Sequence, residues 1–172
     1  MAILEIKRYP EEVLKRKALP VEEINGKLQT LIDDMIETMY AAPGIGLAAP
    51  QVGVSKRLIV VDVGYKEGKS SLLTILNPEI NLSEESIDSE EGCLSVPGHI
   101  VTIKRSARVI VRGLDRNGRP LEIEAEGLLA RALQHEIDHL NGILIIDRLG
   151  PFRRELLKKK ILKERRESSR DK

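Results

Sequence analysis

The sequence predicts an α+β fold in a single domain. One predicted helix precedes a run of strands and two helices follow it, so strands and helices do not alternate as β-α-β units. The chain has 172 residues, of which 41% are hydrophobic, and this length suits one compact core. Charged residues make up 32%, and no apolar stretch reaches the roughly 20 residues that span a bilayer. We therefore expect a soluble globular protein.

The first elements are predicted to be helical. Residues 11–16 have room for one or two turns. A longer helix is predicted over residues 25–41, because apolar side chains recur there at i, i+3, i+4 and i+7. These side chains are Leu28, Leu31, Ile32, Met35, Ile36, Met39 and Tyr40. Pro43 ends this helix, and a loop of small residues is expected to continue through Gly53.

Strands are predicted to dominate residues 57–125. The β-rich runs are residues 57–63, 72–77, 100–104 and 108–114. The first two flank a polar connection and are predicted to form a hairpin. Asn117-Gly118 lies between two further apolar runs, which is a strong signal for a second hairpin.

The C-terminal part returns to helix. A helix is predicted over residues 126–140, and Asn141-Gly142 is expected to end it as a C-cap. Its apolar side carries Leu128, Leu129, Ala132, Leu133, Ile137 and Leu140. A short β-like run, 143–146, precedes a break at Gly150-Pro151, after which residues 152–167 are predicted to form a basic helix with a polar tail. We expect residues 1–150 to be the catalytic domain and 151–172 to be an appendage of it.

Composition narrows the function classes. Aromatic residues make up 2%, which argues against a stacking platform for single-stranded nucleic acid. The single cysteine, Cys93, excludes an intramolecular disulfide, and the N-terminus has no secretory signal pattern, so a cytoplasmic location is expected. The net charge of +1 is unevenly distributed. Residues 148–172 hold 11 of the 28 Lys and Arg but only 4 of the 27 Asp and Glu, a net +7 that leaves −6 for the rest.

His135-Glu136-Ile137-Asp138-His139 is an H-E-x-x-H motif within the second predicted helix. Four residues advance a helix by little more than one turn, so both imidazoles can reach one metal ion. Glu136 is placed to border a water on that metal. The motif therefore predicts a catalytic metal site.

Two histidines do not complete such a site, and a third ligand is required. The candidates are Cys93, His99 and a downstream carboxylate such as Glu155 or Glu164. Taken alone, a lone cysteine is more often a small buried hydrophobe. Cys93, however, lies in the tight segment Glu91-Gly92-Cys93-Leu94-Ser95, and its thiolate is a good soft ligand.

A third segment, residues 44–53, is rich in Gly and Ala. Residues 44–49 match the dinucleotide fingerprint G-x-G-x-x-G/A, but the match is rejected because the segment follows a helix and Pro50 interrupts any helix after it. Such a loop can instead lay its backbone along an extended peptide. Gln51 adds an amide donor.

Together these segments resemble the three motifs of the peptide deformylase family. They are Gly44-Ile45-Gly46-Leu47-Ala48-Ala49-Pro50-Gln51, Glu91-Gly92-Cys93-Leu94-Ser95 and Gln134-His135-Glu136-Ile137-Asp138-His139-Leu140, in the family's order and approximate spacing. The resemblance covers essentially the whole chain. It implies a central helix carrying the histidines among small, mostly antiparallel sheets. It also implies removal of the formyl group from the initiator methionine of new polypeptides.

The resemblance also implies roles for particular residues. Cys93, His135 and His139 would be the metal ligands and Glu136 the general acid/base. Gln51 and the backbone N–H of Leu94 would hold the developing oxyanion. One divalent metal ion per chain is implied, ferrous iron in the cell, with zinc, nickel or cobalt able to replace it. The methionine pocket is expected to involve Ile45, Gly46, Leu128 and Ala132.

Two other hypotheses remain at this point. A zinc endopeptidase with a downstream Glu ligand would keep its metal in a Cys93→Ser variant, whereas a deformylase would lose it or bind it differently. A ribosome-associated binding module with a relic metal site would bind metal without releasing formate. The expected partners of a deformylase are formyl-Met nascent peptides and, through the basic helix, the ribosome. Neither DNA nor a membrane is expected as a partner.

Overall fold

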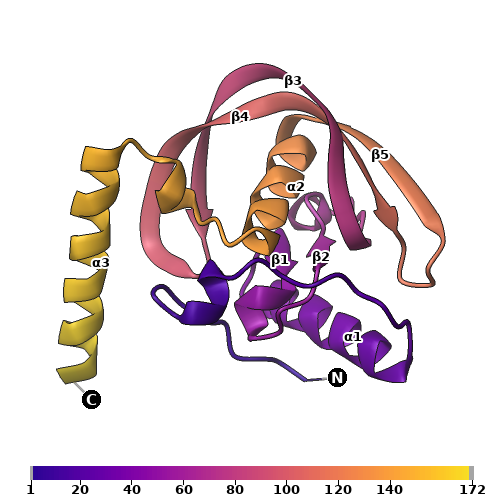
Figure 1. The fold of residues 1–172 in the computed structure, drawn as a ribbon, viewed down its shortest axis with the longest axis horizontal. Coiled ribbons are helices and arrows are strands. Elements are labelled where there is room, and N and C mark those ends of the chain that lie inside the picture. Colours follow the sequence, from indigo (N-terminus) through magenta and orange to yellow (C-terminus); the bar gives the residue numbers. More distant parts are fainter. Residues whose placement is uncertain (1, 171–172) are drawn as a thin grey trace.

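A single antiparallel sheet connects the elements of the chain, whose computed structural model describes residues 2–170 (Figure 1). Its strands lie in sequence order: β1 (Gly46–Ala48), β2 (Leu58–Val61), β3 (Leu73–Cys93), β4 (Val96–Leu114) and β5 (Pro120–Glu126). The helices are α1 (Gly26–Ala41), α2 (Gly127–Leu140) and α3 (Pro151–Arg170). The α+β class is confirmed, whereas the expectation of several small sheets is wrong, because the described strands pair into one.

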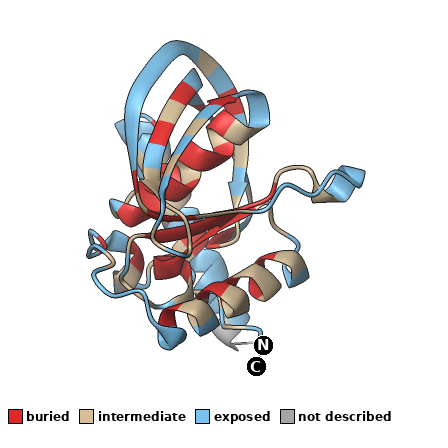
Figure 2. Cartoon of the chain, turned by 90° about the vertical axis from the view of Figure 1, so that its right-hand side faces the viewer, coloured by how far each residue is buried: buried red, intermediate tan, exposed pale blue. Residues whose placement is uncertain are grey.

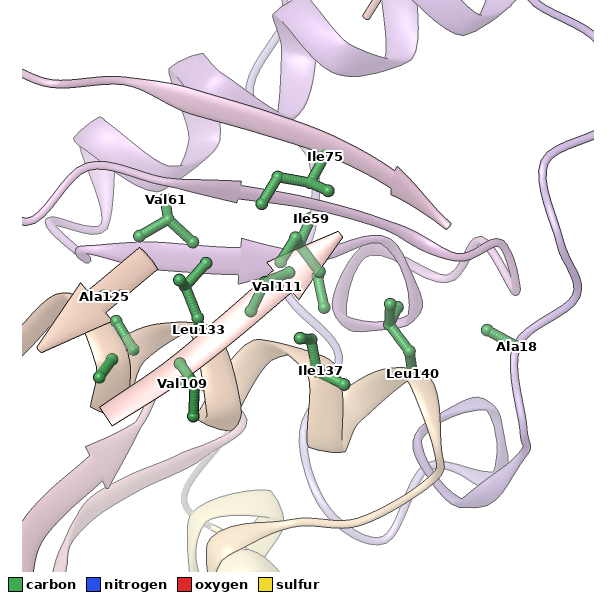
Figure 3. Close-up of a cluster of buried hydrophobic side chains, with 13 residues drawn as sticks. Ala18, Ile59, Val61, Ile75, Val109, Val111, Ala125, Leu133, Ile137 and Leu140 are labelled. Atoms are coloured by element: carbon green, nitrogen blue, oxygen red, sulfur yellow. The ribbon is translucent and has the colours of Figure 1, made fainter. Parts of the chain in front are cut away.

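The short strand β2 lies at the centre of the packing. All four of its residues are buried, because helices cover both faces of the sheet here. Ile59 and Val61 pack with α2, while Leu58 and Val60 pack with α1 (Figure 3 for the α2 side). The α1 side chains in that second cluster are Leu28, Ile32, Met35 and Met39, as the helical spacing predicted. Figure 2 shows the buried residues gathered where helices face the sheet.

Strands β3 and β4 form a long hairpin that arches over α2 (Figure 1). Their pairing has irregularities between Leu76 and Glu79, between Ile80 and Leu82, and at Cys93. Bulges increase local twist and bend a strand, which accounts for the arch. Residues 78–93 were not predicted as strand, because they are mostly Ser, Glu and Asp. They pair with β4 nevertheless, with most of these side chains exposed to solvent.

The small-residue segment after α1 is more ordered than the predicted loop. Gly46–Ala48 pairs with Val61, Val60 and Ile59 as strand β1, and Ala49–Val52 forms a 3₁₀ turn that ends at Gly53 with φ +85°. Three residues are too few for a recognisable alternation of polar and apolar side chains. The strand forms because β2 offers it a ladder of backbone hydrogen bonds.

The C-terminal segment departs from the prediction in two places. Residues 143–146 were expected to be β-like, but Ile145–Arg148 forms a 3₁₀ turn in which the Asp147 carboxylate accepts the N–H of Leu144 at 2.8 Å. Helix α3 then continues through Arg170, where a polar tail from Ser168 was predicted. Its apolar residue Ile161 is buried against β4 and the 3₁₀ turn. Within residues 2–170, no helix combines the length and hydropathy needed to cross a membrane.

Candidate active site

Helix α2 presents two histidines to the same point. Its apolar side chains Leu133, Ile137 and Leu140 are buried beneath the sheet, which holds the opposite side of the helix toward a cavity. The Nε2 atoms of His135 and His139 lie 3.3 Å apart, as expected for residues one turn apart. The helix ends at Leu140 with Asn141 as its C-cap, and Gly142 follows with φ +75°, so the predicted C-cap is confirmed.

Cys93 completes a group of three possible metal ligands. It is the last residue of β3, at the tight turn into β4, and its Sγ lies 3.4 Å from Nε2 of His139. The donor atoms of Cys93, His135 and His139 all lie within 4.8 Å of one another. A thiolate and two imidazoles suit zinc, iron, nickel or cobalt better than magnesium or calcium. The side chains present therefore fit a transition-metal ion.

The alternative third ligands do not belong to this group of donor atoms. His99 and Glu164 contact each other, with Nε2 and Oε2 2.8 Å apart, across the contact between β4 and α3. Glu155 is an exposed residue of α3 beside Arg154. Neither carboxylate belongs to the group of donor atoms around the two histidines.

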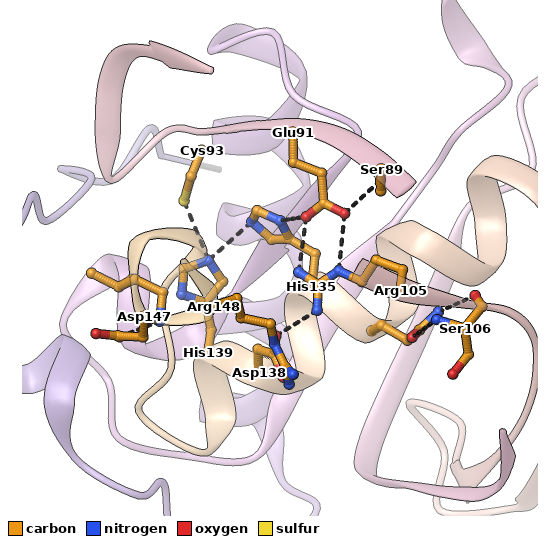
Figure 4. A network of polar contacts seen from close by, with 12 residues as sticks. Ser89, Glu91, Cys93, Arg105, Ser106, His135, Asp138, His139, Asp147 and Arg148 are labelled. Atoms are coloured by element: carbon orange, nitrogen blue, oxygen red, sulfur yellow. Dashed lines mark hydrogen bonds and ion pairs between the residues drawn. The ribbon is translucent and has the colours of Figure 1, made fainter. Parts of the chain in front are cut away.

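Outside the ligand group, Glu91 orients His135 (Figure 4). Its Oε1 lies 3.0 Å from Nδ1 of His135, and Arg105 donates two hydrogen bonds to its carboxylate at 2.8 and 2.9 Å. Burial alone would raise the pKa of Glu91, but the hydrogen bonds from Arg105 and His135 bring it down to about 2. Glu91 is therefore a carboxylate that fixes the imidazole so that its Nε2 faces His139.

Arg105 extends this network to the next buried acid. Its Nη1 donates to Asp138 at 2.6 Å, and Arg148 binds the same carboxylate with two hydrogen bonds of 2.6 and 2.7 Å. The network joins β3, β4, α2 and the 3₁₀ turn before α3. Sequence reasoning did not assign Glu91, Arg105, Asp138 or Arg148. Two of them lie inside the quoted motifs, but nothing in the sequence shows that Arg105 is buried against them.

Glu136 is buried beside the histidines with an unsatisfied oxygen. Its residue is 4% exposed, and among the described residues no group hydrogen-bonds to its Oε1. Burial raises the pKa of Glu136 to about 7. A carboxyl group that titrates near neutrality can both accept and return a proton. It has this position because Gly46 of β1 leaves room for it: a Cβ there would lie 2.5 Å from Oε2 of Glu136.

Gln51 and Leu94 flank Cys93 from two different segments. The Gln51 amide donates to Oγ of Ser95 at 3.1 Å and lies 3.7 Å from Sγ of Cys93. Its Oε1 accepts the Ala48 N–H at 3.0 Å, which fixes the orientation of the amide. Leu94 occupies the turn between β3 and β4 and faces the same cavity.

These residues surround one cavity of about 780 Å³. Nine of the ten residues predicted for the site line this cavity: Ile45, Gly46, Gln51, Cys93, Leu94, Leu128, Ala132, His135 and Glu136. The tenth, His139, is buried and contacts Cys93 and His135. Ala132 is buried and Leu128 is 44% exposed, so the apolar wall runs from the interior toward the mouth. The structure brings the three sequence segments into one pocket.

Comparison with known proteins agrees with this geometry. The sequence profile described as polypeptide deformylase matches residues 3–155. A curated peptide deformylase from Thermodesulfovibrio yellowstonii is 68% identical over 160 residues, covering 93% of this chain and 97% of the relative. The crystal structure of a peptide deformylase from Legionella pneumophila superposes with a TM-score of 0.90 at 50% identity, covering 98% of this chain and 99% of that one. A peptide deformylase from Ehrlichia chaffeensis, solved in complex with actinonin, gives 0.89 at 43% identity, covering 95% and 98%.

Proposed function

The chain belongs to the polypeptide deformylase family, and from this membership we propose that it removes the formyl group from the N-terminal formyl-methionine of nascent polypeptides. The products are formate and a free amino terminus. The observation that carries this proposal is the group formed by Cys93, His135 and His139 beside buried Glu136 in one cavity. An endopeptidase with a downstream Glu ligand is not favoured, because no downstream carboxylate among the described residues joins the histidines.

We assign Cys93, His135 and His139 as the ligands of one divalent metal ion, Fe(II) in the cell, with Zn, Ni or Co able to substitute. When bound, the metal supplies Lewis-acid activation of the attacking water and of the formyl carbonyl. Glu91 supports the assignment, because a histidine ligand normally donates its second ring N–H to a carboxylate.

Glu136 moves the protons in this mechanism. Its carboxylate accepts a proton from the water that attacks the formyl carbon, and the resulting acid returns it to the departing amine nitrogen. The pKa of about 7 that burial produces suits both steps at neutral pH. The unsatisfied Oε1 is the atom that would accept the proton.

Gln51 and Leu94 are assigned to the negative charge that grows on the formyl oxygen. The Gln51 amide is fixed by Ala48 and Ser95, so its N–H need not reorganise during the reaction. The Leu94 backbone N–H would be the second donor. Ile45, Gly46, Leu128 and Ala132 are assigned to the methionine side chain, for which their shared cavity offers an apolar wall.

Formate release from a formyl-Met tripeptide tests the function, with protein purified anaerobically and loaded with Fe(II). We expect turnover by the wild type and a loss of about 10²–10⁴-fold in kcat for Glu136→Gln, with metal content unchanged. Cys93→Ser should lose or alter metal binding. A metal-loaded wild type that releases no formate would contradict the proposed function.

We further propose a cytoplasmic enzyme whose basic helix α3 contacts the ribosome, with residues 1–150 as the catalytic part. Several basic side chains of α3 are exposed: Arg153, Lys159, Lys160, Lys163 and Arg166. Replacing Lys159, Lys160 and Lys163 by Glu should weaken ribosome binding and flatten its salt dependence, because contacts to RNA phosphates release counterions. If the wild type and the triple variant cosediment equally with ribosomes at low and at moderate salt, the proposed ribosome contact is contradicted.

A further inference from the structure

A second cavity continues from the catalytic one along helix α3. It measures about 730 Å³ and lies among the N-terminal segment, the end of α1 and α3. Four residues line both cavities: Ile6, Arg8, Ala42 and Pro97. The two spaces therefore adjoin along these four residues. We name the second cavity the α3 groove.

Arg8 lies where the two cavities meet, and three hydrogen bonds fix the backbone of its segment. Its neighbours Lys7 and Tyr9 donate their N–H groups to the carbonyls of Gln51 and Ser95, at 2.6 and 2.9 Å. Nη1 of Arg165, from α3, binds the Arg8 carbonyl oxygen at 3.1 Å. The backbone is thus tied to both motif segments beside Cys93 and to α3, while the Arg8 side chain is exposed and faces both cavities.

The acidic side chains of the α3 groove already have side-chain partners. Glu5 contacts Lys7 at 3.4 Å, Glu11 contacts Arg165 at 3.4 Å, and Glu164 contacts His99 at 2.8 Å. Within residues 2–168, Arg8 forms no ion pair. The uncommitted charge that this groove offers a ligand is therefore positive. A guanidinium in that position favours carbonyl oxygens and carboxylates and disfavours ammonium groups.

We propose that the residues of the formyl peptide downstream of the methionine pass Arg8 and lie in the α3 groove, and that Arg8 makes acidic residues preferred there over basic ones. The proposal rests on the proposed function and adds the substrate's course beyond the first residues. The lining that the two cavities share carries it, because the downstream peptide must leave the catalytic cavity and the α3 groove adjoins that cavity. Arg8 is a specificity-determining residue in this scheme and takes no part in the proton transfers.

The test uses formyl-Met hexapeptides that carry a single Glu or Lys at the third, fourth or fifth position in an otherwise uncharged sequence. The readout is the ratio of kcat/KM for the Glu peptide to that for the matched Lys peptide. The wild type should favour Glu by about three- to tenfold in at least one position, since an exposed guanidinium attracts Glu and repels Lys by a few-fold each. The preference should weaken with added salt.

Charge reversal at Arg8 separates this effect from a structural one. Arg8→Glu should invert the ratio at the same position, and Arg8→Gln should bring it close to one. Arg119→Glu is the matched control, because it makes the same change in net charge at an exposed residue that lines neither cavity. An equal ratio for wild type and Arg8→Glu at every position would overturn the proposal. An inversion of the Glu-to-Lys ratio by Arg119→Glu would also overturn it.

A steric variant tests the α3 groove itself. Ala41 is an exposed residue that lines the groove and not the catalytic cavity. Ala41→Trp should lower kcat/KM for the hexapeptides relative to a formyl-Met tripeptide, whereas Ala41→Ser should leave that ratio as in the wild type. An unchanged ratio in Ala41→Trp would count against the groove. If the metal-loaded wild type hydrolyses no formyl peptide, the proposed function fails; if it hydrolyses all of them without charge preference, only this inference fails.

Discussion

Single residues decide whether the site can do chemistry, and Gly46 shows how. Its missing side chain leaves the space that the Glu136 carboxylate occupies, while its backbone pairs with Val61 in the sheet. A glycine can serve both purposes because its hydrogen atom lets another group approach the backbone closely. The position of the Glu136 carboxylate is thus set by a residue on a different element.

Gly46→Ala should inactivate the enzyme without unfolding it. The new Cβ would lie 2.5 Å from Oε2 of Glu136, so the buried carboxylate has to move. We expect kcat to fall by about 10²-fold or more, since a displaced base no longer reaches the water, with metal content unchanged. Formate release and elemental analysis measure the two effects. Gly26→Ala, whose Cβ meets open space, is the control, and full activity in Gly46→Ala would refute the steric argument.

Buried ionic contacts connect strands β3 and β4 with helix α2. Arg105 of β4 is 4% exposed and binds Glu91 of β3 and Asp138 of α2. Each of these charges would be costly to bury alone, because it loses its hydration. Burial is tolerated because the three charged groups contact one another. They set the turn that carries Cys93 against the helix that carries the histidines.

Arg105→Met should therefore affect both stability and metal binding. It leaves Glu91 without its cation and Asp138 with Arg148 as its only cation, which costs about 3–5 kcal/mol of unfolding free energy. Loss of the Glu91 orientation should weaken metal affinity by about 10–100-fold. Urea denaturation and competition with a chelator measure these effects. Arg112→Met breaks an exposed pair with Glu122 and should cost less than about 1 kcal/mol; equal costs for the two variants would contradict this account.

A second buried acid ties strand β2 to the connection that follows it. Asp62 is fully buried and accepts hydrogen bonds from the side chains of Tyr40 and Ser70, both at 2.6 Å, and from two backbone N–H groups. Burial alone would raise the pKa of Asp62, but the hydrogen bonds from Ser70, Ser71 and Tyr40 outweigh it and lower the pKa. The ionised carboxylate is the form that stabilises the fold.

Asp62→Asn should destabilise the protein most at neutral pH. The pKa of Asp62 is lower in the folded protein than in the unfolded chain, where it is about 4. The carboxylate therefore stabilises the fold fully above about pH 4, and this stabilisation is lost as the pH falls through the pKa of the folded state. We expect a loss of about 1.5–3 kcal/mol at pH 7 that shrinks below pH 4. Urea denaturation at pH 7, 5 and 3.5 measures it, with exposed Asp88→Asn as control. A loss that does not change with pH would rule out the ionised carboxylate as its cause.

At the scale of the whole molecule, the assigned metal ligands join two distant parts of the fold. Cys93 ends the long strand β3, while the two histidines lie on α2, more than 40 residues further along the chain. A metal bound to all three stabilises the native state over the unfolded chain, which has no preformed site.

Removing the metal should lower both activity and thermal stability. Metal at 100 times its Kd adds about 2.7 kcal/mol, equivalent to about 5–10 °C in Tm for a chain of this size. Calorimetry of the holo and chelated proteins, followed by addition of Fe(II) or Zn(II), measures the shift. Cys93→Ser should show a much smaller one. An identical Tm with and without metal would mean that the three side chains do not form the site.

Much of the fold could be predicted because its signals are local. The apolar spacing of α1 and α2, the Asn-Gly turn between β4 and β5 and the Gly142 C-cap each depend on neighbours within a few residues. The missed elements are the non-local ones. Strand β1 and the polar half of β3 exist only because a partner strand satisfies their backbone groups, and no local pattern records that partner.

The type of chemistry could be inferred from residue types and their spacing, since H-E-x-x-H on a helix and a cysteine in a tight segment specify the donor atoms. Which of these groups share the site depends on how the chain packs. Cys93 joins the histidines while His99 and Glu164 pair with each other, and Gly46 leaves room for Glu136. The burial that raises the pKa of Glu136, and the position of Arg8 between two cavities, likewise depend on packing. The physical reason is that donor chemistry belongs to a residue, whereas burial, orientation and proximity belong to the fold around it.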